Sequence, residues 1–288
     1  MEPVSHILIP VEDYDLHSTL TSGQAFRWRR QNDGWEGVID GRWIHLQKTP
    51  AGINATCMSI AGDAEWNWLT HYLQASVNLD DILKTFPEDR PLGESVAACR
   101  GLRLLRQDPW ECLASFICSS TKQIIQIQQI IELLCQRHGE LIRTPANTPS
   151  VFSFPSPARM ASLSEAELRT CKMGFRAPYL REAAQAVQAG QLDLEHLRTL
   201  SCSQARTALT QLSGVGEKIA NCVLLFAYGF PEAFPVDVWI MKALRQLYFP
   251  KRRPTPARLR RFIETHFGPN AGYAQQYLFH FMRTRLAG

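Results

Sequence analysis

The residues best suited to chemistry are a lysine and an aspartate that lie 19 positions apart in the second half of the chain. Lys218 follows two glycines, Gly214 and Gly216, that lie between two stretches with helical spacing of apolar residues. Glycines this close together allow a tight turn. We therefore expect Lys218 in the first turn of the next helix, where the helix dipole disfavours a cation and so favours the nucleophilic amine.

The same turn is a candidate site for a phosphate group. A helix that begins directly after a glycine turn presents free backbone N–H groups and the positive end of its dipole. Gly214, Val215 and Gly216 would then contact a nucleic-acid backbone without reading its bases. An ordinary connection between two helices explains these glycines equally well.

Asp237 follows Pro235 and Val236 at the start of a new helical pattern. Aspartate is a common helix N-cap, and that role alone would account for it. A helix N-terminus also holds a carboxylate in its anionic form. Beside an amine nucleophile, such a carboxylate suits a reaction that builds positive charge on a sugar ring. Cys222 lies one turn after Lys218 on the same predicted face, although a small core residue is the simpler interpretation.

Basic residues are concentrated in the later part of the chain. Residues 1–100 hold 8 Lys and Arg against 14 Asp and Glu, whereas residues 101–288 hold 23 against 13. Eight basic residues and no acidic one occur between Met241 and Arg261. A charge run of this kind is often only a solvated helix face, but its single sign also predicts attraction for a polyanion such as nucleic acid.

The eight cysteines form no CxxC pair and no compact cluster, which argues against zinc and iron–sulfur sites. We expect free thiols and no metal or cofactor. The N-terminus lacks the basic segment and apolar run of a signal peptide, and no 18-residue apolar stretch occurs. These features favour an intracellular protein without a membrane partner, and we expect a monomer.

The elements that must position these residues divide the chain into two parts. Residues 1–97 hold short apolar runs, and Asp40-Gly41 between two of them predicts a β-hairpin. There we expect strands at 24–29, 34–39 and 42–46 and a helix at 63–74. Apolar residues then recur at helical spacing. We expect helices at 110–118, 123–138, 164–172, 177–189, 203–211, 216–228, 237–248, 256–266 and 271–284, and a proline-rich loop at 144–157.

The sequence therefore predicts an α+β protein, with a small N-terminal antiparallel β domain at 1–97 and a larger helical domain at 98–288. Its motifs together resemble the helix–hairpin–helix glycosylase superfamily and, within it, the 8-oxoguanine DNA glycosylase family. Besides the hairpin and Lys218, the shared motifs are Ser22 to Trp28, Gly101 to Pro109, Ser115 to Ser120, Gly174 to Ala177, Pro235 to Val238 and Ala274 to Phe279. The resemblance implies a TBP-like β domain and an all-helical helix–hairpin–helix catalytic domain.

The resemblance also implies an enzyme of base excision repair that flips 8-oxoguanine out of duplex DNA. Lys218 would attack C1′ of the deoxyribose, expel the base and form a Schiff base. Asp237 would help to deprotonate the lysine and stabilise the oxocarbenium-like centre. Elimination of the 3′ phosphate would then nick the strand.

The implied base pocket consists of four residues. The carbonyl of Gly23 would read the N7–H that 8-oxoguanine has and guanine lacks, and Gln275 would bond the Watson–Crick edge. Phe279 and Cys222 would enclose the ring. On the opposite strand, the resemblance implies that Phe175 inserts into the duplex and that Arg176 meets the orphaned cytosine.

The chain departs from the family pattern in its eukaryotic branch at four DNA-side positions. Thr121 replaces an asparagine, and Gln126 replaces a second cytosine-contacting arginine. Trp239 replaces a histidine on the phosphate side, and Met282 replaces the acidic partner of that histidine. We therefore expect intact lysine chemistry with relaxed selectivity for the base opposite the lesion.

Two alternatives remain open from the sequence. A glycosylase of the same superfamily for another damaged base would keep the hairpin, although members without this lysine cannot form a Schiff base. A non-catalytic helix–hairpin–helix DNA-binding protein would keep the glycines and the basic stretch, but it has no need for Lys218 and Asp237 together.

Overall fold

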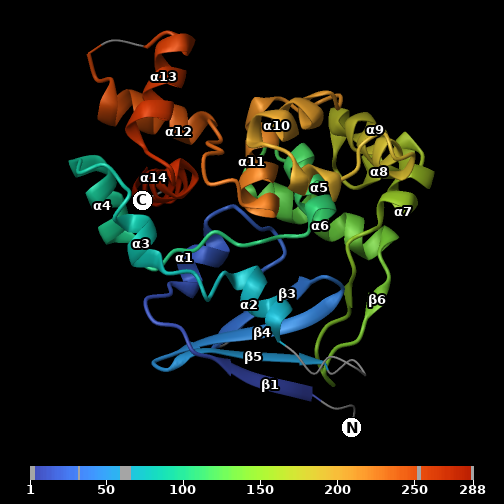
Figure 1. Cartoon of the computed structure of the whole chain (residues 1–288). Coiled ribbons are helices and arrows are strands. Elements are labelled where there is room, and N and C mark those ends of the chain that lie inside the picture. Colours follow the sequence, from blue (N-terminus) through green and yellow to red (C-terminus); the bar gives the residue numbers. More distant parts are fainter. Residues whose placement is uncertain (1–3, 32, 59–65, 252–253, 287–288) are drawn as a thin grey trace.

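The computed structural model describes residues 4–31, 33–58, 66–251 and 254–286. An antiparallel sheet lies at one end of the molecule, and helices make up most of the rest (Figure 1). The strand order is β1-β5-β4-β3-β2. The strands span Val4–Ile9 (β1), Arg29–Gln31 (β2), Gly34–Ile39 (β3), Arg42–Thr49 (β4) and Gly52–Met58 (β5).

The hairpin predicted at Asp40-Gly41 is confirmed. Both residues have positive φ, +48° and +71°, and Ile39 pairs with Arg42 across the turn. This backbone matches the twist of the two strands that it joins. Strands β1 and β5 were not predicted.

The strand predicted at residues 24–29 is wrong, because only Arg29 lies in β2. The side chain of Gln24 donates to the carbonyls of Thr19 and Arg103 and accepts from the N–H of Leu105. Gln24 is fully buried. Long-range side-chain hydrogen bonds therefore hold this segment in an irregular path where a strand would need a neighbouring strand.

Two helices, α1 (Leu16–Thr21) and α2 (Asn67–Leu73), pack against the sheet. Their buried leucines share one apolar cluster with Ile44 and Ile53 of the sheet. The helix predicted at 63–74 corresponds to α2; its first residues, 63–65, lie outside the described residues.

The other helices form the larger part of the fold, close to the predicted ranges. Their bounds are Pro109–Cys118 (α5), Ile124–His138 (α6), Pro157–Ser162 (α7), Glu165–Thr170 (α8), Ala177–Gln188 (α9), Cys202–Thr210 (α10), Glu217–Val223 (α11), Val238–Ala243 (α12), Pro256–His266 (α13) and Ala271–Leu286 (α14). Short helical turns lie at Gly174–Arg176 (η1) and His196–Thr199 (η2), and π-helical turns extend α11 (Leu224–Tyr228, η3) and α12 (Leu244–Tyr248, η4). Two-residue strands, Leu141–Ile142 (β6) and Val151–Phe152 (β7), flank the proline-rich loop.

Two helices that were not predicted, α3 (Leu79–Leu83) and α4 (Arg90–Ala98), lie beside α14 (Figure 1). Leu79 and Leu92 belong to the core of the helical part. The fold is thus a small antiparallel sheet followed by a helical domain, as predicted, while the division at residue 97 stays a prediction.

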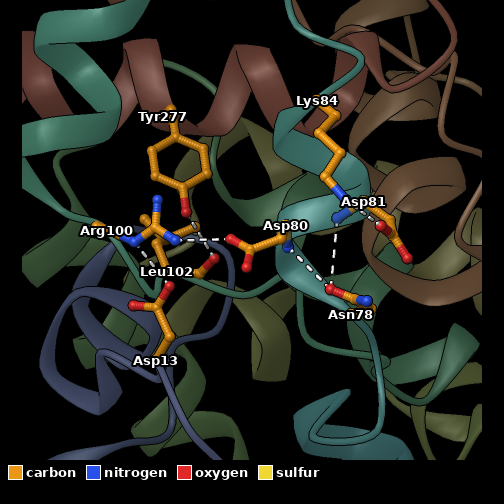
Figure 2. Close-up of polar contacts among 8 residues, drawn as sticks. All are labelled: Asp13, Asn78, Asp80, Asp81, Lys84, Arg100, Leu102 and Tyr277. Carbon is orange, nitrogen blue, oxygen red and sulfur yellow. Dashed lines mark hydrogen bonds and ion pairs between the residues drawn. The ribbon is translucent and has the colours of Figure 1, made fainter.

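Arg100 ties the loop before α1 to α3. Its guanidinium lies 2.8 Å from Asp13 and 2.6 Å from Asp80, as Figure 2 shows. Next to these pairs, the hydroxyl of Tyr277 in α14 donates to the carbonyl of Leu102 over 3.2 Å. These contacts fix the chain where the sheet gives way to the helices. No helix in the described ranges is long and apolar enough to cross a membrane.

Candidate active site

The predicted turn between two helices is present between α10 and α11. Gly214 has φ +78°, and a Cβ at this position would lie 2.5 Å from the ring of Tyr179. Glycine is therefore needed at this position for both its backbone conformation and its lack of a side chain. Gly216 is the N-cap of α11, where no cap hydrogen bond from a side chain is present in the described part of the chain.

Val215 differs from its two glycine neighbours. Its side chain is buried in the helical core, and its N–H donates to the carbonyl of Leu212 over 3.1 Å. Of the three turn residues, Val215 therefore anchors the turn to the core, and the glycines form its exposed surface.

Lys218, the second residue of α11, is half-buried at the end of α5. Its Nζ donates to Oγ of Ser119 over 3.0 Å and lies 5.3 Å from the centre of the Phe116 ring. The Ser119 hydroxyl in turn donates to the carbonyl of Phe116 over 2.7 Å. The amine is thus held in one place by groups that carry no charge. Sequence reasoning missed Ser119, which lies in a quoted motif but gives no signal of its own.

Asp237 is the N-cap of α12, as predicted, and accepts a hydrogen bond from the N–H of Ile240 over 2.8 Å. Burial raises the pKa of Asp237 above that of an ordinary aspartate, while the Ile240 N–H and the positive charge of Lys218 act to lower it. The expectation that the helix N-terminus sets the charge state is therefore incomplete, because desolvation is the larger influence. The effect of Lys218 shows that the fold brings the two residues near each other.

Cys222 lies in the same neighbourhood, one turn after Lys218. Only 4% of its surface is exposed, and burial raises the pKa of its thiol to about 11. Lys218 and Asp237 both influence this pKa, in opposite directions. Cys222 therefore stays a neutral thiol and packs in the helical core.

Gly23 and Phe279 also lie together, although they come from opposite ends of the chain. A Cβ on Gly23, whose φ is +75°, would lie 3.4 Å from the Phe279 ring and 2.7 Å from Cδ1 of Ile124. Gln276 of α14 holds this loop by donating to the carbonyl of Ser22 over 2.9 Å. Sequence reasoning missed Ile124, because an isoleucine at the start of a helix resembles any core residue.

Gln275 is 3% exposed, and its Oε1 has no hydrogen-bond partner among the described residues. A buried amide oxygen without a partner costs about 1–3 kcal/mol. A bound ligand or an ordered water would supply the missing partner.

Four of the remaining predicted residues, Phe175, Arg176, Thr121 and Gln126, lie in η1, in the loop between α5 and α6, and in α6. Phe175 is 55% exposed, whereas its neighbour Arg176 is buried. The Arg176 guanidinium donates to the carbonyls of Met173 and Ser120 and to Oγ1 of Thr121. Arg176 thus holds the loop between α5 and α6 from inside, and in this structure it is directed toward the protein.

Two polar groups near this loop serve the protein itself. Thr121 has φ +56°, a left-handed backbone that a β-branched residue rarely adopts. Gln126 accepts a hydrogen bond from the N–H of Gln123 over 3.1 Å at the start of α6.

Two further predicted positions lie away from this loop. Trp239, in the first turn of α12, is half-buried, and the centre of its ring lies 5.8 Å from Nζ of Lys242. Met282 is buried in a small cluster with Ala243 and Phe281.

Comparison with known protein families accounts for most of the chain. Residues 6–113 match the model of the 8-oxoguanine DNA glycosylase N-terminal domain. Residues 114–269 match the model of the HhH-GPD superfamily base excision DNA repair protein.

Individual relatives agree with these matches. The chain is 30% identical to the probable N-glycosylase/DNA lyase of Methanothermobacter thermautotrophicus, over 96% of this chain and 95% of the relative. It is 31% identical to the N-glycosylase/DNA lyase OGG1 of Arabidopsis thaliana, over 92% and 76%. Among solved structures, the 8-oxoguanine glycosylase/lyase of Clostridium acetobutylicum, bound to double-stranded DNA with cytosine opposite 8-oxoguanine, has a TM-score of 0.88 at 29% identity, covering 97% of this chain and 98% of that one.

Proposed function

The chain belongs to the HhH-GPD superfamily of base excision DNA repair proteins, as an N-glycosylase/DNA lyase with the N-terminal domain of 8-oxoguanine DNA glycosylases, and we propose that it excises 8-oxoguanine with Lys218 as the nucleophile. The observation that carries this proposal is the fixed, half-buried amine of Lys218 close to the carboxyl of Asp237. A DNA-binding protein without catalysis has no use for this pair. The relatives also carry the name N-glycosylase/DNA lyase.

The reaction follows from these two groups. The neutral amine of Lys218 attacks C1′, the bond from C1′ to the base breaks, and the base leaves with the electron pair. Asp237 accepts the proton that the lysine must lose and offsets the positive charge that develops on the sugar. The amine adduct then opens to a Schiff base, from which loss of a C2′ proton expels the 3′ phosphate.

The base pocket that we propose combines the loop at Gly23 with α14 and α11. The Gly23 carbonyl accepts the N7–H that distinguishes 8-oxoguanine from guanine. Gln275 supplies a buried amide whose oxygen lacks a partner in the described chain, so an incoming base edge satisfies it. Phe279 and Cys222 cover the two faces of the ring.

On the opposite strand, we propose that Arg176 meets the orphaned base and that Phe175 fills the gap in the duplex, because Phe175 is exposed beside it. Arg176 must first exchange its bonds to Ser120 and Thr121 for the base. Gln126 is engaged at the start of α6 and carries no charge, so it contributes less than a second arginine. We expect a preference for cytosine of about ten- to hundredfold, which is the value of one charge-assisted hydrogen bond.

The test of this preference is single-turnover excision from four duplexes that differ only in the base opposite 8-oxoguanine. A preference of a thousandfold or more would show that Arg176 alone, or a further group besides Arg176, enforces the pairing.

The domains that carry these residues are, in our proposal, 1–97 and 98–288. We place the enzyme inside the cell, in the cytoplasm or nucleoid of a bacterium or in the nucleus of a eukaryote.

Borohydride trapping on 8-oxoguanine duplex tests the nucleophile. The protein should be trapped covalently, and Lys218→Gln should abolish trapping while it binds the duplex, because the hairpin is unchanged. Lys122→Gln is the matched control, since Lys122 is a lysine of the α5–α6 loop. Undiminished trapping by Lys218→Gln, or loss of trapping only in the control, would refute the assignment.

A further inference from the structure

A groove of about 590 Å³ begins at Asp237 and runs along α12 into η4. Two cationic residues, Lys242 and Arg245, line it together with the apolar Val238 and Met241. These four residues recur at the spacing of one helix face. The groove therefore continues directly from the proposed catalytic carboxyl, and its lining is both cationic and apolar.

The two cations of the groove are exposed, and neither has an acidic partner within 4.0 Å in the part of the chain that the structure describes. Elsewhere exposed arginines do find such partners: Arg90 lies 2.7 Å from Glu94 in α4, and Arg169 pairs with Glu165 in α8. Among the described residues, Asp237 is the single carboxyl that lines the groove, and one of its oxygens accepts the Ile240 N–H. The groove thus carries a net positive charge that the protein does not neutralise.

The apolar side of the groove is also left uncovered by the protein. Val238 follows Asp237 directly, yet 79% of its surface is exposed, which is the largest value among the exposed large hydrophobic residues in the described ranges. Lys242 is less free, since its amine lies 5.8 Å from the centre of the Trp239 ring. This contact favours positions of the ammonium near the start of α12 over positions further out in solvent.

We propose that this groove binds the sugar–phosphate backbone of the damaged strand next to the flipped nucleotide. Lys242 and Arg245 would contact phosphates, and Val238 would pack against a deoxyribose. Alternating anionic and apolar groups are the chemistry of such a backbone, and the groove offers both at helical spacing. This inference rests on the proposed function, because it takes Asp237 to be at the damaged nucleotide. Trp239 is, in this view, a positioning residue for Lys242.

Equilibrium binding to a duplex with an uncleavable abasic-site analogue tests the groove separately from catalysis. For wild type and for Lys242→Gln/Arg245→Gln, affinity is measured against salt concentration. Each phosphate contact contributes about 0.9 to the slope of log affinity against log salt. The double variant should therefore lose about 1.8 from the slope. Arg260→Gln/Arg261→Gln, which removes the same charge from exposed positions of α13, should lose clearly less.

A second measurement locates the contact. A single neutral methylphosphonate is placed at successive linkages on either side of the abasic site, in the damaged strand or in its complement. Wild type should lose affinity at one or two linkages of the damaged strand. Each loss should be about three- to fourfold larger at 50 mM than at 200 mM salt, because one phosphate contact contributes about 0.9 to the slope. The affinity of the double variant should not change when the same linkages are neutralised. Lys242→Arg/Arg245→Lys keeps both charges, so its affinity should fall at these linkages as that of wild type does.

Several outcomes would overturn the proposal. Equal slopes for wild type and the double variant would show that Lys242 and Arg245 contact no phosphate. If methylphosphonates weaken binding only in the complementary strand, the groove binds that strand instead. Equal losses in the α13 control would show a diffuse charge effect. Failure of the Lys218 assignment would appear instead as unchanged trapping in Lys218→Gln, which these binding measurements do not involve.

Discussion

The two sides of the active site are built on very different backbones. On the lysine side, the left-handed backbone position of the turn is a glycine, Gly214, and Asp237 is an ordinary N-cap. On the side of the α5–α6 loop, Thr121 holds a left-handed conformation at φ +56°. A β-branched residue in this region costs of order 1–3 kcal/mol. The lysine side is thus relaxed, and the opposite side stores strain.

Arg176 explains how the strained side persists. Its guanidinium bonds the Ser120 carbonyl and the Thr121 hydroxyl from inside the protein, and burial lowers the pKa of Arg176. The same guanidinium is the group that we assign to the orphaned base. If Arg176 leaves the loop to contact the base, the strained Thr121 backbone loses the bonds that hold it. Lys218, by contrast, is already in place. In our proposal, the catalytic lysine is thus preorganised, whereas contact of Arg176 with the opposite base requires a rearrangement.

The largest expected effect is at Asp237, where the relaxed side performs its chemistry. Asp237→Asn keeps the cap, since asparagine is about as good an N-cap, but removes a base that is worth about 10²- to 10⁴-fold. Single-turnover excision should fall by that factor while duplex binding is retained. Asp108→Asn is the matched control, because Asp108 caps α5 in the same way. Near wild-type excision by Asp237→Asn would reduce Asp237 to a cap.

The raised pKa of Asp237 gives this variant a second signature, in stability. A carboxyl whose pKa is raised by folding favours the protonated form, so the folded protein loses stability as the pH rises from the unfolded value of about 3.9 through the raised one. An asparagine side chain carries no such cost, because it does not ionise. Asp237→Asn should therefore be at least as stable as wild type at neutral pH, with the difference vanishing below about pH 3.9. Thermal unfolding across pH measures this difference, and a less stable variant at neutral pH would contradict it.

An intermediate effect is expected at the turn itself, where two glycines form a natural matched pair. Gly214→Ala places a Cβ 2.5 Å from the Tyr179 ring at a positive φ and should cost about 1–3 kcal/mol in the free energy of unfolding. A Cβ on Gly216 meets nothing within 4 Å, so Gly216→Ala should change that free energy little. Chemical denaturation measures both variants. Equal losses in the free energy of unfolding for the two variants would mean that the backbone conformation of Gly214 does not stabilise the turn.

Gly216→Ala sharpens the comparison further when DNA is added. Gly216 begins α11 on the exposed surface of the turn. If a phosphate approaches this backbone, a new methyl group weakens duplex binding without loss of stability. Binding equal to wild type would place the phosphate elsewhere.

The smallest expected effect is on the strained side. Asparagine tolerates the left-handed region better than threonine, so Thr121→Asn should raise the free energy of unfolding by about 1 kcal/mol. Thr121→Ala is the control, because it keeps the unfavourable φ, loses the bond to Arg176 and should destabilise. If both variants destabilise equally, the loop stores no strain that asparagine relieves.

The parts of the fold that local pattern dictates were predictable. Helices with apolar spacing and clear caps, such as α5 after Asp108 and α6 before Gly139, were found within a few residues. The segment at Gln24 was misassigned, because its aromatic neighbours are typical of a strand while its path depends on bonds to residues about 80 positions later. Strand β1 was overlooked for a related reason, because its partner in the sheet is β5, far away in the sequence. Strand β5 was overlooked although it also pairs with β4, the strand directly before it in the sequence.

The candidate site divides in the same way. Lys218 and Asp237 are marked by glycine, proline and capping patterns that a sequence displays. The residues packed around the site are not marked in this way. Ser119 beside Lys218, Tyr179 beside Gly214 and Ile124 beside Gly23 are common residue types whose role appears only in three dimensions. The buried, inward direction of Arg176 also could not be read from its motif, because it results from the fold of the Ser120–Thr121 loop.

The hydrogen bond from Gln276 to Ser22 joins residues 254 positions apart. It can therefore form only late in the synthesis of the chain. The hairpin and Lys218 leave the ribosome well before α14, so a nascent chain already carries its reactive amine while the Gly23 loop still lacks its anchor. Such a chain also lacks part of its helical core, because Ala274, Tyr277 and Leu278 of α14 belong to it. The pocket that we propose for the lesion is thus completed last in synthesis, when α14 closes on the loop made first.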